Sequence, residues 1–251
     1  MMKQLVNRLM LLLGGALVAV LASCQQQVAP PVRVTPMPEA QTPYERFVSS
    51  SKLYPTVMEI YLDDVLLKEA DSRSRIVICL SQQRGRLYVN DKVAADWPVS
   101  SGADTHPTPT GQFRVRFKEK EHYSNRYGKM YDAEGKCIDN NADVFTQPVP
   151  EGGRFDGSPM PNWMRLTYDG VGMHTGKVKA GRRLSHGCIR LPHVISTMLF
   201  DIVKVGTRVV INQEVEPEYP VNAILARREL EEADTAQKPE PEELWYTTEE
   251  G

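Results

Sequence analysis

The sequence has no apolar run long enough to cross a membrane. Its longest, from Leu9 to Leu21, has 13 residues, whereas a membrane-spanning helix needs about 20. Lys3 and Arg8 precede the run, so residues 1–23 have the pattern of a secretory signal peptide. We therefore expect this segment to direct export and to be absent from the mature protein.

The end of this segment, Leu21-Ala22-Ser23-Cys24, resembles the lipobox of bacterial lipoproteins. The resemblance implies that Cys24 is lipidated and becomes the first mature residue, so that acyl chains anchor the protein to a membrane. Because Gln25 and not aspartate follows the cysteine, we expect a periplasm-facing place on the outer membrane of the cell envelope. The alternative is an ordinary cleavage site beside a chance cysteine.

The sequence also has little net charge. A formal net charge of −2 is not typical of a nucleic-acid-binding protein, and we expect no nucleic-acid partner. The distribution is uneven, since residues 213–251 contain 12 acidic and 3 basic residues while residues 24–212 carry a net charge of +5. A mildly basic body suits an anionic polymer as partner.

Cysteines are few, and only two of the four are free to pair. Cys24 is expected to carry the lipid, and Cys188 lies in the turn RRLSHGCIRLP. Cys79 and Cys137 could form the disulfide that is common in exported proteins. Cys79 lies in an apolar strand pattern, however, and we favour a buried free thiol there.

The remaining chain predicts one mainly β catalytic domain with extensions. Residues 24–43, rich in Pro and Gln, predict an extended tether, and residues 44–74 predict an N-terminal extension with a short helix. From residue 75 to residue 212, short alternating segments bounded by turn residues predict a β-sandwich or barrel-like fold with one or two short helices. The strand segments are RIVICLS, GRLYV, VAADWPVS, GQFRVRFK, WMRLTY, VGMH and TRVVI.

One of these segments, GQFRVRFK, predicts a single half-buried strand. Its apolar residues alternate with basic ones, as expected for a sheet with one face in the core. The buried face would carry Phe113, Val115 and Phe117, and the exposed face Arg114, Arg116 and Lys118.

Helical spacing of apolar residues from Val194 to Val203 predicts one helix, with Pro192 at its start and Gly206 at its end. In the acidic C-terminal extension, residues 213–251, we expect a helix over 221–232 within an otherwise solvated and mobile segment.

Residues 118–161 have few apolar runs and are rich in Gly, Asn, Asp and Pro. A loop of this length is typically a functional lid or a disordered insertion. We expect a lid over the active site, with Tyr127, Phe155 and Trp163 as wall residues.

The turn RRLSHGCIRLP contains the candidate nucleophile, Cys188. A cysteine is nucleophilic as a thiolate, so it needs positive charge, dipoles or a base that lowers its pKa. Gly187 permits a tight turn, so the amides of Gly187 and Cys188 could form an oxyanion hole. His174 ends a predicted strand and is separated from Ser185 by ten residues, and a return of the chain would bring it beside Cys188. This is the Cys/His pairing of nucleophilic acyl transfer.

At this point the sequence resembles the catalytic domain family of L,D-transpeptidases, the YkuD-type domain. Four colinear stretches within residues 75–211 carry the resemblance: ICLSQQRGRLYVNDK, PVSSGADTHPTPTGQF, NWMRLTYDGVGMH and MHTGKVKAGRRLSHGCIRLP. It implies a YkuD-like fold and a cysteine that attacks the third residue of a peptidoglycan stem tetrapeptide, expelling the terminal D-alanine.

The resemblance assigns roles to the matching positions. Cys188 would be the nucleophile and His174 the base, with the Thr175 carbonyl orienting its ring. His186 and Gly187 would shape the site. The expected substrate contacts are Arg190, Ser185, Trp163 and Met173. Arg190 stands where many members have asparagine, so it either binds a substrate carboxylate or makes a structural salt bridge, and Ser185 either caps the turn or contacts substrate. His106, His122 and His193 have no such constellation and are expected to be solvated or capping.

The resemblance implies an acyl-enzyme that needs no cofactor and no metal. An acceptor amine would complete transpeptidation and cross-link the wall, and carbapenem β-lactams would acylate the cysteine. If water attacked the acyl-enzyme instead, the protein would be an L,D-carboxypeptidase or a hydrolase of cross-links or protein attachments. Two rivals are a zinc module ligated by His174, His186 and Cys188, and a non-catalytic peptidoglycan-binding module. No further His or Cys lies at a convincing zinc-ligand spacing.

Overall fold

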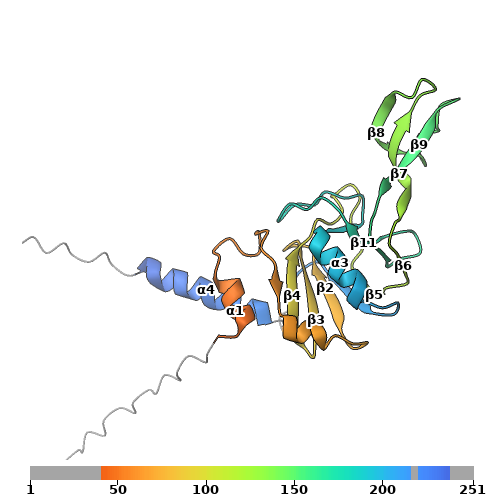
Figure 1. Ribbon diagram of the computed structural model, residues 1–251. Helices are drawn as coiled ribbons and strands as arrows, with labels where there is room; N and C mark the ends of the chain where they lie inside the picture. Colours follow the sequence, from red (N-terminus) through yellow and green to blue (C-terminus); the bar gives the residue numbers. More distant parts are fainter. Residues whose placement is uncertain (1–40, 216–219, 238–251) are drawn as a thin grey trace, which may run out of the picture. The chain divides into compact units, whose positions relative to one another are not determined.

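The computed structural model describes residues 41–215 and 220–237. The expected signal peptide, Cys24 and nearly all of the expected tether lie outside these residues. None of the helices within the described ranges has the length and apolar character that a membrane span requires. The described chain is mainly β, as expected, with three sheets and four helices (Figure 1).

The largest sheet has six strands in the order β1-β4-β3-β2-β13-β5. Strands β2, β3 and β4 form an antiparallel meander, β13 lies parallel to β2, and β5 pairs antiparallel with β13. Ile76 and Ile78 enter the main core, while Val77 enters a second cluster on the opposite face. Burial on both faces explains the continuous apolar run of β2. The strands are Tyr61–Leu62 (β1), Arg75–Cys79 (β2), Arg84–Val89 (β3), Lys92–Pro98 (β4), Gly111–Arg114 (β5) and Arg208–Asn212 (β13).

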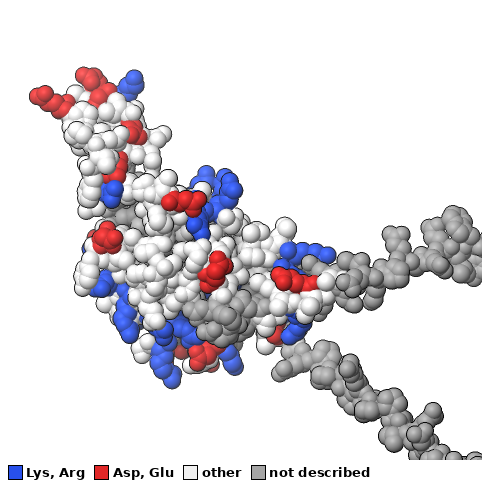
Figure 2. All heavy atoms as spheres, turned by 180° about the vertical axis from the view of Figure 1, so that it is seen from behind, with Lys and Arg blue, Asp and Glu red and all other residues white. Residues whose placement is uncertain are grey.

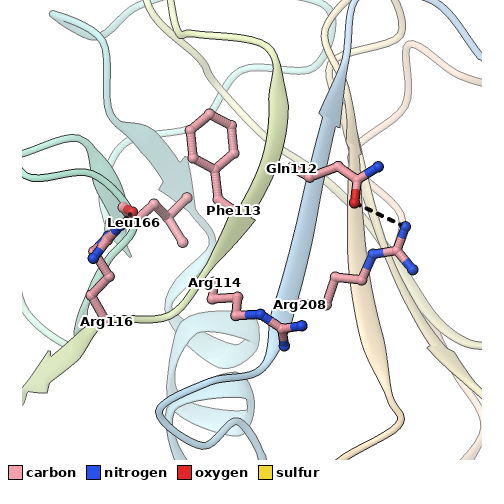
Figure 3. Close-up of a pocket in the computed structure, with 6 residues that line it drawn as sticks. All are labelled: Gln112, Phe113, Arg114, Arg116, Leu166 and Arg208. Atoms are coloured by element: carbon pink, nitrogen blue, oxygen red, sulfur yellow. Dashed lines mark hydrogen bonds between the residues drawn. The ribbon is translucent and has the colours of Figure 1, made fainter.

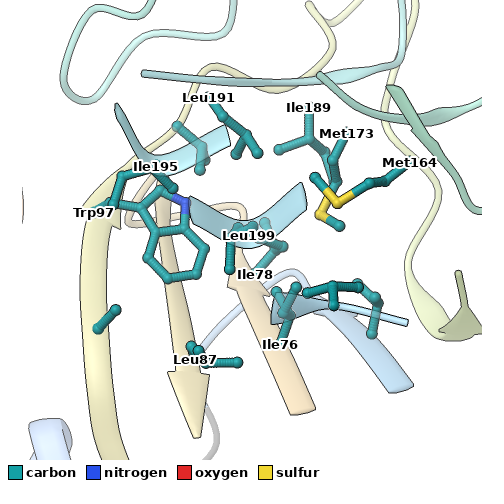
Figure 4. Packing of buried hydrophobic residues seen from close by; sticks show 14 of the residues in the cluster. Ile76, Ile78, Leu87, Trp97, Met164, Met173, Ile189, Leu191, Ile195 and Leu199 are labelled. Carbon is teal, nitrogen blue, oxygen red and sulfur yellow. The ribbon is translucent and has the colours of Figure 1, made fainter. Parts of the chain in front are cut away.

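A second sheet contains the strands next to His174 and Cys188. Its order is β12-β11-β10-β6, where β11 and β12 are parallel and the other pairs are antiparallel. The predicted helix is confirmed as α3, which packs with this sheet over the main core (Figure 4). The bounds are Phe117–Glu119 (β6), Trp163–Arg165 (β10), Gly172–Thr175 (β11), Ile189–Leu191 (β12) and His193–Ile202 (α3). We call these two sheets with α3 the body.

The prediction of one strand over GQFRVRFK is wrong. The chain passes from the first sheet to the second between β5 and β6, where the Val115 amide bonds to Thr207 and the Arg116 amide to Arg165. Val115 is buried as predicted, but Phe117 is 51% exposed. A two-residue alternation continues through such a crossing, so the sequence pattern does not reveal it.

The N-terminal extension packs on both faces of the six-stranded sheet, with Tyr44 and Val48 in the far cluster and Leu66 and Leu67 against the main core. It contains α1 (Pro43–Ser49) and α2 (Asp64–Lys68), so the short helix expected here is confirmed. The predicted C-terminal helix is also confirmed, as α4 (Pro220–Gln237), which contacts α1. Ile224 of α4 is buried in the same cluster as Tyr44 and Val48 of α1. Part of the C-terminal extension, at α4, therefore packs on the domain through a buried side chain and is not a solvated segment there.

A buried ionic cluster joins the extension to the sheet. The Asp96 carboxylate accepts hydrogen bonds from Arg84 Nε at 2.6 Å, Arg86 Nε at 2.9 Å, Tyr44 at 2.6 Å and Tyr54 at 2.7 Å. The side chains of Arg84, Arg86 and Asp96 have no exposed surface. Burial acts to raise the pKa of Asp96, but the charges of Arg86 and Arg84 outweigh it, so that this pKa lies below its usual value.

The segment predicted as a lid loop forms a third sheet, which we call the distal sheet. It consists of β7 (Tyr123–Tyr131), β8 (Cys137–Asp143) and β9 (Arg154–Pro159), with β7 in the centre. Most of its side chains are exposed or half-buried, which is why it lacks the apolar alternation of a predicted strand. Acidic side chains gather at its far end (Figure 2).

Cys79 and Cys137 are both free. Cys79 is buried in β2 and Cys137 is exposed on β8, at the start of a distal-sheet strand. The favoured interpretation of a buried free thiol at Cys79 is confirmed.

Candidate active site

Two neighbouring strands bring the expected nucleophile and base together. β11 runs parallel to β12, with His174 in register with Arg190. Cys188 directly precedes β12, and its side chain and that of His174 line one cavity of about 780 Å³. Backbone pairing of two strands therefore sets the spacing of the pair, independently of the loop that connects them.

The turn that presents Cys188 is closed by Ser185. The Ser185 hydroxyl donates a hydrogen bond to the Cys188 carbonyl and accepts one from the Gly187 amide at 3.1 Å. Gly187 has φ +112°, a conformation that favours glycine. Of the two expected interpretations, the geometry places Ser185 as the turn cap. The Gly187 amide is thereby occupied, which leaves the Cys188 amide of the expected oxyanion pair.

The His174 ring is held in a fixed orientation and in its neutral form. Its Nδ1 donates a hydrogen bond to the Thr175 carbonyl at 2.9 Å, which leaves Nε2 as the proton acceptor of the neutral ring. Burial, to which the Trp163 ring 5.9 Å away contributes, lowers the pKa of His174 from 6.5 to about 4. The Thr175 hydroxyl contacts Ser196 at 2.6 Å, which fixes this residue against α3.

Cys188 is half-buried, and its thiol is protonated at rest. Burial raises the pKa of Cys188, against the opposing effects of the Gly172 amide and the Arg190 charge, while Asp169 raises it further. The sequence pattern suggested that nearby charges and dipoles lower the pKa of Cys188, but these groups do not offset the desolvation and the pKa is raised. The Cys188 thiol donates a hydrogen bond to the Gly170 carbonyl at 3.7 Å, so the cavity holds a neutral thiol and a neutral imidazole.

The cavity is lined by most, but not all, of the expected residues. Met173 is an exception, because its side chain is fully buried in the main core beneath the site. Phe155 lies in β9, where its ring packs near Gly128, and it is not among the cavity residues. The expected residues that line the cavity are His174, Thr175, Ser185, His186, Gly187, Cys188, Arg190, Trp163 and Tyr127.

Arg190 lines the cavity. None of the ion pairs within the described ranges involves this side chain. Burial lowers the pKa of Arg190, and the nearby Cys188 acts in the opposite direction. Of the two interpretations, a structural salt bridge is not found in this part of the chain, and a guanidinium free to bind a carboxylate remains.

Two histidines that sequence reasoning left aside also line the cavity. The His122 ring stacks on Trp163 at 4.9 Å, and the His106 ring lies 4.8 Å from His186. His106 lies within a stretch that resembles the family, and that position could have marked it. His122 has no local signal, because its contact with Trp163 arises only when β6 pairs with β10.

The distal sheet forms one wall of the cavity. The Tyr127 ring of β7 stacks on His186 with centroids 4.4 Å apart, and Arg126, Asn141 and Ser158 of the three strands also line the space. Across the described residues, no group of three or more His, Cys, Asp or Glu side chains has the arrangement of a metal site.

Comparisons with known proteins find relatives of this chain. The Bacillus subtilis (strain 168) protein named "Putative L,D-transpeptidase YqjB" is 29% identical over 128 residues, which are 51% of this chain and 65% of that protein. An L,D-transpeptidase from Mycobacterium smegmatis is 22% identical with a TM-score of 0.43 over 56% of this chain and 58% of that one. LdtMt1 in complex with imipenem is 24% identical, with a TM-score of 0.43 over 55% and 58%.

The catalytic domain of the E. faecium L,D-transpeptidase is 28% identical, with a TM-score of 0.41, and 56% of this chain covers 98% of that domain. The family model for the L,D-transpeptidase catalytic domain, YkuD, matches residues 73–211. Since this match covers more than half of the chain, the protein belongs to the YkuD family of L,D-transpeptidase catalytic domains.

Proposed function

We propose that the protein is a cysteine-dependent L,D-transpeptidase that acts on peptidoglycan stem tetrapeptides. The main observation in support is that Cys188 and His174 line the same cavity, where the Thr175 carbonyl orients the His174 ring through a hydrogen bond of 2.9 Å. That arrangement supplies a nucleophile, a base and an orienting group, which acyl transfer requires.

The reaction follows from the resting protonation states. His174 Nε2 takes the thiol proton as the Cys188 sulfur attacks the carbonyl of the third stem residue, and the Cys188 amide faces the oxyanion. Collapse breaks the bond to D-alanine, whose amine takes the proton from His174, and leaves a thioester. The acceptor amine then attacks the thioester and passes a proton to His174, and the Cys188 thiol is restored when that proton returns.

Transfer is favoured over hydrolysis by the wall that the distal sheet contributes. Its contact through Tyr127 and His186 covers the cavity next to the nucleophile, and exclusion of water protects a thioester for the amine. With the same acyl-enzyme, access of water would give an L,D-carboxypeptidase or a hydrolase of cross-links or protein attachments. A binding module without catalysis would not require the Cys188 and His174 pairing.

The proposal includes an envelope location and a class of inhibitor. The segment up to Cys24 suits a lipoprotein signal, so the catalytic domain would work from a membrane anchor, on the periplasmic face of the outer membrane. Carbapenems would acylate Cys188 by opening their lactam ring. The solved complex of LdtMt1 with imipenem makes that compound the probe of choice.

The test is the mass of the protein after incubation with imipenem, and of the products formed from muropeptides that carry tetrapeptide stems. We expect one adduct on Cys188 and cross-linked dimers that lack one D-alanine. Cys188→Ala should lose the adduct and at least about 10³-fold in turnover, whereas Cys137→Ala, which removes the exposed thiol, should change neither. Tripeptide products would indicate the hydrolase, and the absence of any adduct or product from the unmodified protein would rule out both enzymes.

A further inference from the structure

A second cavity, of about 480 Å³, lies along β5 at the edge of the six-stranded sheet. Figure 3 shows its residues, which come from β5, β13, the crossing between the sheets and the segment after β10. They are Gln112, Phe113, Arg114, Arg116, Leu166 and Arg208. None of the expected catalytic or substrate-binding residues is among them.

Within the part of the chain that the structure describes, the three guanidiniums of this cavity donate hydrogen bonds to uncharged groups. Arg114 donates to the Gly206 carbonyl at 2.9 Å, Arg116 to the Leu166 carbonyl at 3.1 Å, and Arg208 to the Gln112 amide oxygen at 3.3 Å. Within the described ranges, none of the three forms an ion pair. Each keeps N–H donors free, in the forked arrangement that binds a carboxylate through two hydrogen bonds.

The same cavity has an apolar floor. Leu166 is buried and Phe113 half-buried, and the Leu166 side chain reaches toward Phe113 (Figure 3). Cationic groups around an apolar surface suit a ligand that carries both carboxylates and small aliphatic groups. An acidic peptide with alanine methyl groups has this chemistry, whereas a bare inorganic anion would leave the floor unused.

One short segment separates the two cavities. Leu166 lines the second cavity, while Arg165 and Tyr168 line the cavity with Cys188. The Arg116 guanidinium stacks on the Tyr168 ring at 3.7 Å. Tyr168 therefore lines the cavity with Cys188 and also contacts an arginine of the second cavity. A polymer with closely spaced peptides can therefore present one peptide to each side of this segment.

We propose that this second cavity binds a carboxylate-bearing stem peptide of the peptidoglycan polymer while another stem occupies the cavity with Cys188. The inference rests on the proposed function. Its consequence is a preference for polymeric over isolated substrate, because the second contact raises the effective concentration of stems near the nucleophile.

The test compares the full-length protein with the double variant Arg114→Gln, Arg208→Gln. Both arginines are exposed and lie outside the cavity with Cys188. We expect unchanged turnover of a soluble tetrapeptide and, from the loss of two guanidinium contacts, about five-fold weaker cosedimentation with intact sacculi. The control, Lys52→Gln with Arg227→Gln, removes the same charge from exposed positions elsewhere and should bind sacculi as the unmodified protein does.

Further arms identify the ligand and separate the two proposals. Converting the sacculus carboxylates to amides should abolish the difference between the double variant and the unmodified protein, and so should a rise in salt. Equal cosedimentation of both proteins with untreated sacculi would overturn the inference, as would a difference seen only with vesicles of anionic phospholipid, which would indicate a membrane contact. Absence of turnover in the unmodified protein would count against the proposed function alone, since sedimentation still decides the inference.

Discussion

The body and the distal sheet are both antiparallel in large part, yet they are held together by different means. All six residues of β3 are buried, whereas no residue of β9 is. In the distal sheet, close backbone approach takes the place of apolar packing, since a Cβ on Gly157 would lie 2.0 Å from the Ser124 carbonyl oxygen and one on Gly128 would lie 2.2 Å from that of Asp156. The body therefore derives its stability from burial, and the distal sheet depends on glycine at a few positions.

The strongest test of this contrast replaces one aspartate in each region with asparagine. Asp96 and Asp143 both pair with arginine, but Asp96 has no exposed surface and Asp143 keeps contact with water. We expect Asp96→Asn to lower the free energy of unfolding by about 3–5 kcal/mol, because Arg84 and Arg86 lose their buried counterion. Asp143→Asn should leave the urea midpoint unchanged. Similar losses for both variants would contradict the contrast.

A smaller effect is expected from pH. Since the pKa of His174 is about 4 when folded, against 6.5 as its ordinary value, the unfolded chain binds more protons between these values and the stabilising effect is complete only above pH 6.5. Stability should thus fall by about 2 kcal/mol from this group between pH 7 and pH 5.

The measurement is the urea-induced unfolding of the unmodified protein and of His174→Gln at several pH values. His174→Gln should lose this part of the pH dependence. His193→Gln, which changes an exposed histidine, is the control and should retain it. Parallel pH curves for the unmodified protein and His174→Gln would show that the imidazole is not buried in its neutral form.

The smallest effect concerns the distal sheet itself. Gly128→Ala would force β7 and β9 apart, because the added methyl group also meets the Phe155 ring at 2.7 Å. We expect the ratio of hydrolysis to transfer to rise about three-fold, or about 0.6 kcal/mol in relative barrier, with little change in the stability of the body. Product analysis on muropeptides measures it, and Lys129→Ala, at an exposed position of the same strand, should leave the ratio as it was.

The sequence predicted those parts of the fold that apolar periodicity specifies. Strands such as β2 and the helix α3 follow from patterns of buried residues, and the turn at Gly187 follows from its local residues. The crossing after Val115 and the strands of the distal sheet do not, because neither changes the pattern of apolar residues along the chain. The cavity residues differ in the same way. Cys188 could be predicted because it lies in a local motif, whereas His122 could not, because it reaches the cavity only through the pairing of strands.

The protonation states of Cys188 and His174 could not be predicted from the local sequence for a related reason. The charges near Cys188 are visible in the sequence, but the desolvation that opposes them depends on how Trp163 and the strands close around the pair. The pKa values of Cys188 and His174 therefore move in directions that the motif alone does not indicate.

The ionic cluster around Asp96 has a consequence for where the folding unit begins. The family match starts at residue 73, but Tyr44 and Tyr54 provide two of the hydrogen bonds to this carboxylate, and the Val57 and Glu59 carbonyls accept from Arg84. A chain trimmed to the homologous region would leave two guanidiniums partly open to water and a carboxylate short of donors. Recombinant versions of this protein should start no later than residue 41, since the segment that homology omits completes the interior of the domain.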